Sequence, residues 1–407
     1  MVNIYLNRTA LKCKTNIDSQ MCFNISYSVY LFSFILNLSF YRKFLPLKLI
    51  SVICVLILFI GELLKGKYTL KEASFLALCM LLSLLAYLRG GYAMFLHFMF
   101  IFCNRHIPLK QTAKLTVAVS CIALIIIITS AYVGVIPNHV VHFLQNNSPR
   151  ERVYLGFLYA LYPSMLLYNI VSMDLYIHRK QLTLFRCLWW TALSTLMYWK
   201  TDSRLSYFLT LLIVISFLFL KKWPFLVKKF DFVFKMMISS FIICPIVSFG
   251  LTLSYSYNNV FIRNLNTILE GRLRLGKNAF QEYDIKLFGQ EIQYIGNGLN
   301  ANGETANGIY NYVDCFYENI LLRYGLIFFI LVIIFFTSCL SIAYKKKNYH
   351  LIILLTVLAV HGIIDDLVLY VYYNTLWLLI GICIFSSRNI EPLQEKLKAQ
   401  FSKMFMT

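Results

Sequence analysis

The amino-acid sequence consists largely of apolar runs long enough to cross a bilayer, separated by short charged segments, and this pattern constrains the fold most. The hydrocarbon core of a bilayer is about 30 Å thick, which a helix of about 20 residues crosses. Hydrophobic residues make up 59% of the 407 residues and charged residues 14%, so a soluble globule could not hide the apolar surface. The runs are uniformly apolar, whereas the strands of a membrane barrel alternate. The sequence therefore predicts an all-α polytopic membrane protein.

The apolar runs predict about twelve transmembrane helices, which we treat as one integral membrane domain over residues 1–407. They are residues 22–40, 45–64, 70–88, 90–106, 113–136, 152–173, 182–200, 204–220, 231–254, 317–344, 349–366 and 371–387. Most lysine and arginine clusters fall on one side of this arrangement, which the positive-inside rule makes cytoplasmic, together with both termini. The exception is the connection that carries Arg42, Lys43 and Lys48, which this orientation places outside.

The formal net charge of +20 does not indicate a nucleic-acid-binding protein. The basic residues lie in short clusters beside apolar runs, where attraction to anionic lipid of the inner leaflet explains them. The 11 cysteines have no metal-ligand spacing, and no nucleotide-binding or zinc-binding motif occurs. We therefore predict no metal and no cofactor, and expect the N-terminus to continue into a span rather than to be a cleaved signal peptide.

Residues 255–316 form the longest polar segment and are predicted to be a long external loop that carries part of the site. Arg272 and Arg274 follow Gly271 there, in a loop where topology needs no positive charge. Planar guanidinium groups bind phosphate oxygens in pairs, and the alternative is a basic patch that lies on lipid headgroups. The apolar spacing also predicts an amphipathic helix on the membrane surface, with Leu269, Leu273 and Phe280 on one face.

A second anion-binding position is predicted where the apolar run after Arg204 begins. Asp202 or Ser203 can cap this helix, whose free N–H groups and dipole favour an anion. With Arg204 beside them, the helix start is a candidate phosphate site. The alternative is a capped helix with an arginine that reaches the headgroups. Arg150 and Arg152 introduce a further helix on the same outer face.

His361 and Asp365 are four residues apart, so they share one face of a helix, and Asp366 follows directly. A carboxylate beside an imidazole is one arrangement for a general base. The alternative is a structural hydrogen-bond network between the last two helices. Asp314 and Glu318 supply a second pair of carboxylates at the end of the long loop.

Several short motifs occur together in a fixed order along the chain. They are Arg152-Val153-Tyr154-Leu155-Gly156-Phe157, Thr201-Asp202-Ser203-Arg204, Leu265-Asn266 with Gly271-Arg272-Leu273, Leu287-Phe288-Gly289, and Val313-Asp314 with Tyr324-Gly325. Each motif by itself is short and degenerate, but their order over residues 115–385 resembles the Wzy-type polysaccharide polymerases of bacterial capsule and O-antigen loci.

The resemblance implies a membrane glycosyltransferase of the GT-C-like class, with the broad fold of the O-antigen ligases. The functional arginines of that family would correspond to Arg152, Arg204 and Arg272. The family often has a glutamate near the end of its penultimate span, where this chain has Asp365 followed by Asp366. It also often has a histidine and an asparagine after the Gly-Phe pair, which residues 158–164 do not supply.

From these features we predict a polymerase that transfers a growing glycan from undecaprenyl diphosphate to the next lipid-linked repeat unit, outside the bacterial cytoplasmic membrane. Its partners would be the lipid-linked oligosaccharide, membrane lipid, and other polysaccharide export or chain-length proteins, without nucleic acid. The predicted catalytic residues are Arg204, Arg272, His361, Asp314, Asp365 and Asp366. The predicted substrate-binding residues are Arg152, Arg274, Tyr283, Tyr317 and Asn374, and Tyr294, Tyr310 and Phe316 are further candidates for stacking on sugar rings.

Two other functions fit the same sequence. A glycan ligase would use the same donor with a different acceptor. A flippase or other transporter of lipid-linked oligosaccharide would also have many spans and an arginine-lined cavity, although the chain shows no internal repeats.

Overall fold

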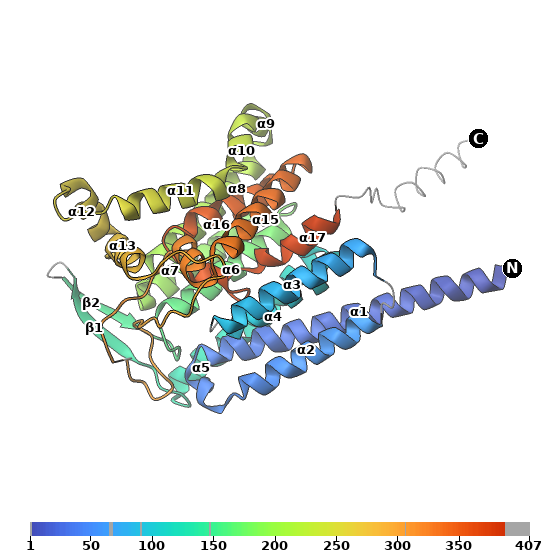
Figure 1. Ribbon diagram of the computed structural model, residues 1–407, viewed down its shortest axis with the longest axis horizontal. Coiled ribbons are helices and arrows are strands. Elements are labelled where there is room, and N and C mark those ends of the chain that lie inside the picture. The colour runs from blue at the N-terminus through green and yellow to red at the C-terminus, as the bar shows by residue number, and fades with distance from the viewer. Residues whose placement is uncertain (1, 65–67, 90–91, 146–147, 306, 387–407) are drawn as a thin grey trace.

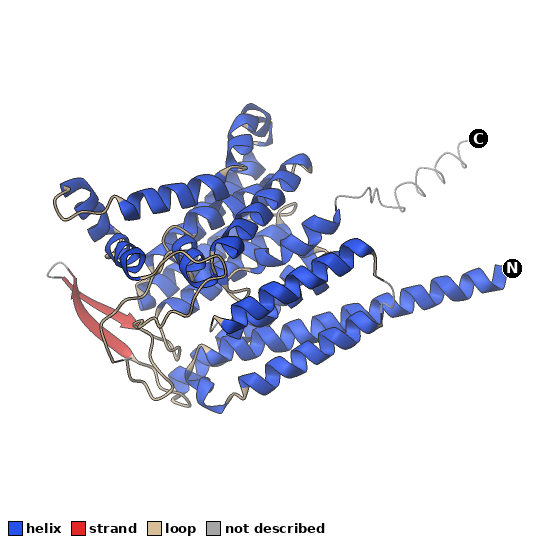
Figure 2. Cartoon of the chain, in the orientation of Figure 1, coloured by secondary structure: helices blue, strands red, loops and turns tan. Residues whose placement is uncertain are grey.

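The computed structural model describes residues 2–64, 68–89, 92–145, 148–305 and 307–386. This part of the chain is mostly helical, with one antiparallel pair of strands (Figure 2). The helices are α1 (Val2–Asn37), α2 (Leu47–Leu63), α3 (Leu70–Leu88), α4 (Tyr92–Cys103), α5 (Leu109–Val133), α6 (Leu161–His178), α7 (Leu184–Thr201), α8 (Arg204–Lys222), α9 (Pro224–Lys229), α10 (Asp231–Met237), α11 (Ser240–Leu253), α12 (Val260–Ile268), α13 (Arg272–Glu282), α14 (Phe316–Asn319), α15 (Leu326–Lys345), α16 (Tyr349–His361) and α17 (Leu379–Ser386). The strands are β1 (Val140–Gln145) and β2 (Ser148–Val153), paired with Val140 opposite Val153.

Several helices are long and apolar enough to cross a membrane, which confirms the class predicted from the sequence. In the described residues there are four such helices, α3, α5, α8 and α15. The pair α10 and α11 meets the same test together but is bent by 59° at its break. The larger number of about twelve spans, expected from the apolar runs alone, stays a prediction.

Two of the expected spans differ from the observed helices at their site-facing ends. The run 152–173 starts as strand β2 and a turn, and its helix begins only at Leu161. Leu155 and Gly156 both have positive φ in that turn, which helical backbone does not allow. The run 349–366 ends its helix at His361, so Asp365 and Asp366 lie in the following irregular segment.

Helix α6 forms the centre of the helical assembly. Every residue from Pro163 to Ile177 is buried, because α5, α7 and α8 pack around the helix. A helix that is apolar on all sides is expected in such a position. Its first turn reaches the end of the molecule where the β-hairpin lies.

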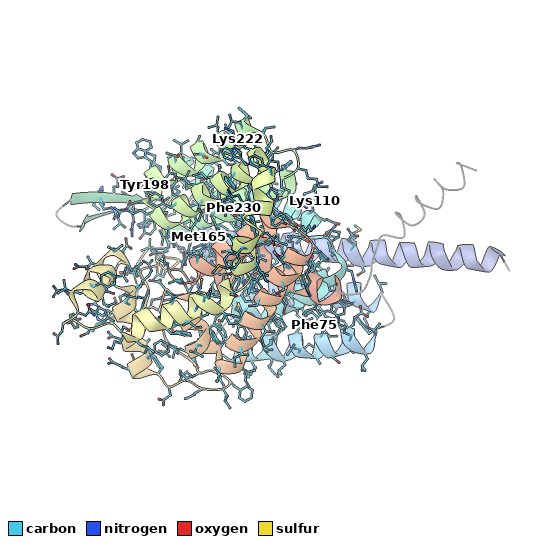
Figure 3. All side chains as sticks on the ribbon, turned by 90° about the horizontal axis from the view of Figure 1, so that it is seen from above. Phe75, Lys110, Met165, Tyr198, Lys222 and Phe230 are labelled. Carbon is cyan, nitrogen blue, oxygen red and sulfur yellow. The ribbon has the colours of Figure 1, made fainter. Side chains whose placement is uncertain are left out.

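The elements around the candidate site gather at one end of the molecule, opposite the start of α1. Figure 1 shows the β1–β2 hairpin, α12, α13 and the long segment before α14 at this end. In the view from above, Tyr198 near the end of α7 lies toward the same end, whereas Phe75 and Lys110 lie toward the other (Figure 3). Residues far apart in sequence therefore meet on one face.

The segment 255–316 is ordered by helices and by backbone contacts. Its apolar residues build α12 and α13, and α13 packs against α11 through Leu273, Gly276 and Ala279. The predicted amphipathic helix is therefore present in part: α13 begins at Arg272 and excludes Leu269, and its apolar face lies against protein. Farther along, the backbone N–H of Leu299 donates to the carbonyl of Leu158 at 2.8 Å, which fixes the loop to the start of α6.

Candidate functional site

A cavity of about 650 Å³ opens among β2, α6, α8, α13 and the segments before α14 and after α16. One part of its wall is apolar and comes from α8 and α13, including Phe208, Leu209 and Leu275. The ionisable side chains of the wall are Arg152, Arg204, Arg272, Arg274, Asp202, Glu270, Asp314 and Asp365. A cavity of this size and mixed lining is typical of a small-molecule or lipid-headgroup site.

Three arginines converge on Asp202 at the turn between α7 and α8. Arg150 forms an ion pair with its carboxylate, and the Nε of Arg152 lies 3.5 Å from Oδ2. The Nε of Arg204 lies 3.9 Å from Oδ1, and its side chain remains 54% exposed. Asp202 has a left-handed backbone conformation, with φ of 51°. The turn therefore holds basic side chains from β2 and α8 at one edge of the cavity.

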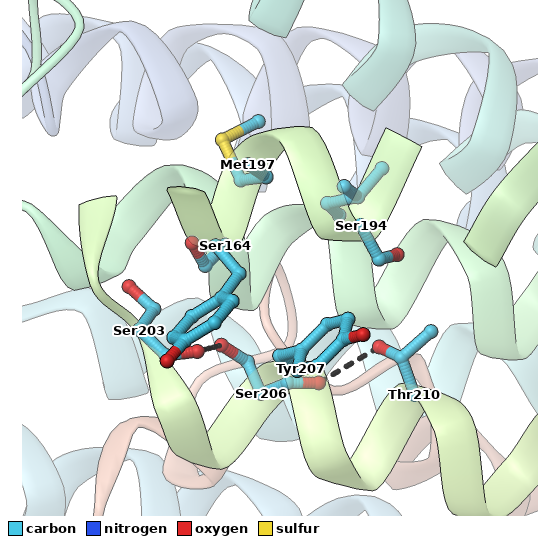
Figure 4. A pocket seen from close by; sticks show the side chains of 9 residues that line it. Ser164, Ser194, Met197, Ser203, Ser206, Tyr207 and Thr210 are labelled. Atoms are coloured by element: carbon cyan, nitrogen blue, oxygen red, sulfur yellow. Dashed lines mark hydrogen bonds between the residues drawn. The ribbon is translucent and has the colours of Figure 1, made fainter. Parts of the chain in front are cut away.

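The turn before α8 is held by a chain of hydroxyl groups. Thr201 lies 2.8 Å from the hydroxyl of Ser164 on α6 and 2.8 Å from that of Ser203. Figure 4 shows the polar crevice that Ser164, Ser203 and Ser206 line. Ser203 is the residue before the helix, yet its side chain does not cap it. The sequence placed the cap at Asp202 or Ser203; the hydroxyl of Ser203 contacts Thr201 instead.

Arg272 begins α13 on the other side of the cavity. Its Nη1 donates to the carbonyl of Leu269 at 3.2 Å, and its Nε lies 3.8 Å from Asp314 Oδ2 and has no hydrogen-bond partner in the described structure. Gly271 precedes it with φ of 89° and supplies no side-chain cap. The first turn of α13 is capped from a distance, because the backbone N–H of Arg274 donates to Asn266 Oδ1 at 3.0 Å. The start of α8 has no cap from Ser203, and such a helix start favours a bound anion.

A side chamber of about 90 Å³ adjoins the cavity and shares Tyr159, Arg272, Asp314 and Asp365 with it. Its wall is rich in tyrosines and carboxylates and includes two glycines. The lining residues that the main cavity lacks are Tyr162, Gly296, Gly298, Tyr312, Asp366 and Leu367.

Asp366 is almost fully buried in the wall of the chamber, with 2% of its surface exposed. Its Oδ2 accepts hydrogen bonds of 2.7 Å from the Tyr312 hydroxyl and from Asn319 Nδ2. Burial, with the charges of Asp314 and Asp365, raises its pKa to about 8. Asp366 is therefore mostly protonated at neutral pH.

Asp314 faces Arg272 and accepts a hydrogen bond of 3.0 Å from the Tyr310 hydroxyl. Burial raises the pKa of Asp314 to about 6, even though Arg272 acts in the opposite direction. The effect of burial on the pKa of Asp314 is larger than the effect of Arg272, because the carboxylate loses its hydration while the guanidinium remains 3.8 Å away.

Asp365 lines both the main cavity and the side chamber, and His361 contacts it from the protein interior. Its Oδ1 accepts the backbone N–H of Leu367 at 2.8 Å, and its Oδ2 lies 3.4 Å from His361 Nε2. The His361 side chain is completely buried and does not line either space. Of this pair, only the Asp365 carboxylate can meet a ligand directly.

The structure brings most of the predicted site residues together. Those that line the cavity or its chamber are Arg152, Arg204, Arg272, Arg274, Asp314, Asp365 and Asp366. His361 contacts the site only through Asp365.

Three predicted substrate-binding residues lie outside the lining. The Tyr317 hydroxyl donates to the carbonyl of Ala359, Asn374 donates to that of Val368, and both side chains are buried. Tyr283 ends α13 and packs against the core. Their observed contacts are structural.

The sequence reasoning did not single out Tyr159, Tyr162, Tyr312, Glu270 or Asn297 as site residues. Tyr162 lies in the first turn of α6, and the others come from turns and from the long loop, where no helical periodicity marks a direction. In the sequence, the run Gly296-Asn297-Gly298 indicates only a turn. Nothing in the sequence marks the positive φ of Glu270. Within the described residues, no group of three His, Cys, Asp or Glu side chains is arranged to hold a metal ion.

The fold and the site define a helical membrane protein with a charged cavity at one end of its helices. Comparison with protein-family models, with curated proteins and with solved structures finds no match.

Proposed function

We propose that the protein is a polysaccharide polymerase of the bacterial cytoplasmic membrane, with its site on the extracytoplasmic face. It transfers the growing glycan from undecaprenyl diphosphate to the next lipid-linked repeat unit, and the chain crosses the bilayer about twelve times. The observation that carries the proposal is one cavity in which arginines and two helix starts face carboxylates. The resemblance of the sequence motifs to Wzy-type polymerases supports the same reaction.

The basic part of the cavity suits the diphosphate of the donor. Arg204 and Arg272 stand at the starts of α8 and α13, and Arg152 approaches from β2. The diphosphate gains negative charge as it leaves, and aligned cationic donors stabilise this charge. The apolar side chains of α8 and α13 in the same wall give the first part of the polyprenyl chain a place beside the lipid.

The reaction needs one proton acceptor. The acceptor hydroxyl oxygen forms a bond to the anomeric carbon of the donor sugar, while the bond from that carbon to the diphosphate oxygen breaks and its electron pair stays with the diphosphate. The hydroxyl proton passes to a carboxylate. Asp365 is placed for this role because it borders both the cavity and the chamber.

The test uses purified protein in lipid nanodiscs with lipid-linked repeat units from the source cells. The parent should form polymer, and Arg272→Lys should reduce the rate about a hundredfold or more while the protein remains folded. Lysine keeps the charge but loses the planar fork. The matched control is Arg263→Lys, because Arg263 is an exposed arginine of α12 outside the cavity wall.

Absence of polymer from the parent under conditions where the substrate is bound would contradict the proposal. Full activity of Arg272→Lys would show that the arginine is structural. In a deletion strain, single repeat units on the cell surface indicate a lost polymerase. Unattached polymer indicates a ligase, and units retained inside the cell indicate a flippase.

A further inference from the structure

The side chamber differs from the main cavity in the chemistry of its wall. Tyr159, Tyr162, Tyr310 and Tyr312 surround Asp314, Asp365 and Asp366. The Tyr159 and Tyr162 rings are 5.5 Å apart and nearly perpendicular, so they form a corner rather than a flat wall. Phenol rings offer apolar faces with a polar edge, and carboxylates accept hydrogen bonds from hydroxyl groups. This combination suits a sugar ring.

The chamber does not suit a diphosphate. Three carboxyl groups share its wall with a single arginine, Arg272, so a second anion would meet like charges. The volume of about 90 Å³ is several times what a single water molecule needs. One edge of a single sugar ring fits in this space, and the rest of the acceptor lies in the main cavity.

The mouth of the chamber is where the acceptor and donor would meet. Asp365, Arg272 and Tyr159 belong to both walls. A hydroxyl group held here faces the base on one side and the diphosphate site on the other. Arg272 Nε–H has no hydrogen-bond acceptor within the described structure, so it can donate to a ligand oxygen without breaking a hydrogen bond.

Gly296 and Gly298 keep the chamber open. A Cβ built on Gly298 meets nothing closer than the Tyr162 hydroxyl at 3.9 Å and the Leu158 carbonyl at 4.0 Å. On Gly296 it would lie 3.4 Å from the Tyr312 ring. Larger side chains at Gly298 would therefore fill the chamber without a backbone clash, and this position permits a graded test.

We propose that the side chamber binds the non-reducing terminal sugar of the acceptor repeat unit, and that it selects a neutral or amino-bearing sugar over an acidic one. The inference rests on the proposed polymerase function, to which it adds the acceptor site and its substrate class. A hexuronic acid would place a carboxylate beside the carboxyl groups of Asp314 and Asp365 and is rejected. Neutral hydroxyl groups can donate to the free oxygens of these carboxyl groups and to the phenol oxygens of Tyr310 and Tyr312, whose own protons are given to Asp314 and Asp366.

The kinetic test measures the KM for the donor and the KM for the acceptor separately. The donor is a lipid-linked repeat unit whose terminal acceptor hydroxyl is methylated. The acceptor is a repeat unit whose anomeric carbon is joined to the lipid diphosphate through a CH2 group in place of the bridging oxygen, so that it cannot act as a donor. Gly298→Ala and Gly298→Val should raise the KM for the acceptor progressively, by about tenfold or more for valine. The KM for the donor should stay near the parent value. Gly250→Val is the control, because a Cβ on Gly250 of α11 meets nothing within 4 Å.

A binding measurement distinguishes failure of the inference from failure of the function. The probe is the glycan released by mild acid from the lipid-linked repeat units, followed by saturation-transfer NMR with protein in nanodiscs. Binding that the parent shows and Gly298→Val loses supports the chamber even if no polymer forms, in which case the polymerase proposal fails alone. An unchanged acceptor KM in Gly298→Val, with an active parent, overturns the inference and leaves the polymerase standing. Equal binding of a glycan with a terminal hexuronic acid overturns the selectivity.

Discussion

Asp366 shows how one buried carboxyl group makes the stability of this protein depend on pH. Below its ordinary pKa of 3.8 it is protonated in both the folded and the unfolded chain. As the pH rises, the unfolded chain loses the proton first, whereas the folded protein loses it only near pH 8. Ionisation therefore stabilises the unfolded state across this range, and the folded protein loses stability between these two values.

The substitution Asp366→Asn should remove this loss. Its amide oxygen can still accept from Tyr312 and Asn319, while the buried group no longer ionises. We expect the Tm of the variant to match the parent near pH 3.5, where Asp366 is protonated in both states, and to exceed it increasingly as the pH rises to 8.5. Asp284→Asn, at an exposed position, serves as the control. A Tm difference that is the same at both pH values would refute this assignment.

Asp365 and His361 should differ in their effect on the proposed reaction. Asp365→Asn removes the proton acceptor and is expected to lower kcat about a hundredfold or more. His361→Gln keeps an N–H group toward Asp365, so we expect a loss of only about tenfold, with a changed pH profile and unchanged donor KM. Initial rates measured over a range of pH values give the kcat and the pH profile of each variant. A larger loss of kcat in His361→Gln than in Asp365→Asn would show that His361, and not Asp365, is the proton acceptor.

At the scale of elements, two of the sequence motifs meet through their backbones. The N–H of Gln290 donates to the carbonyl of Arg323 at 3.0 Å, and that of Ile327 donates to Leu287 at 3.2 Å. Gly289 and Gly325 both have positive φ, and a Cβ on either would collide with the backbone of the other segment. The contact joins the segment after α13, within the long loop, to the start of α15, so both glycines have a packing role.

The variant Gly325→Ala should therefore lower stability by about 2–3 kcal/mol or more, since backbone must move to admit the methyl group. Gly134→Ala is the matched control: Gly134 has φ of 83° at the end of α5, and a Cβ there meets nothing within 4 Å. We expect the control to lose only about 1 kcal/mol from the strained φ. Thermal unfolding in detergent compares the two. Equal losses would mean that φ alone matters at Gly325.

The elements that sequence reasoning predicted well are those with a strong apolar pattern. The runs that became α3 and α8 begin and end close to the predicted residues, whereas the run 317–344 has its long helix α15 only from Leu326. The β1–β2 hairpin was missed, because Arg152 stands directly before an apolar run that continues through α6. Composition cannot show that Leu155 adopts a positive φ and delays the helix to Leu161.

At the scale of the whole molecule, the site depends on segments separated by more than two hundred residues. Arg152 on β2, Arg272 on α13 and Asp365 after α16 line one cavity. The shared outer face of these residues was predicted from the alternation of spans. The distances between these residues were not predicted, because these distances depend on the backbone of turns and of the long loop. The tyrosines of the side chamber lie in these same segments.

The orientation of the chain in the membrane yields the last prediction. Asn302 lies exposed in the long loop on the site side, whereas Lys346 follows the last turn of α15 and is also exposed. A helix rises about 1.5 Å per residue, so the 20 residues of α15 are long enough to cross the hydrocarbon core. The basic residues Lys345, Lys346 and Lys347 favour the cytoplasm at its end.

Single cysteines at these two positions, in a variant without the native cysteines, should react differently in intact cells. Asn302→Cys should be labelled by an impermeant thiol reagent, and Lys346→Cys only after the membrane is opened. Because both side chains are exposed, accessibility of the local structure does not explain a difference, and the membrane barrier does. The reversed pattern would place the arginine cavity in the cytoplasm, where an extracytoplasmic polymerase could not use it.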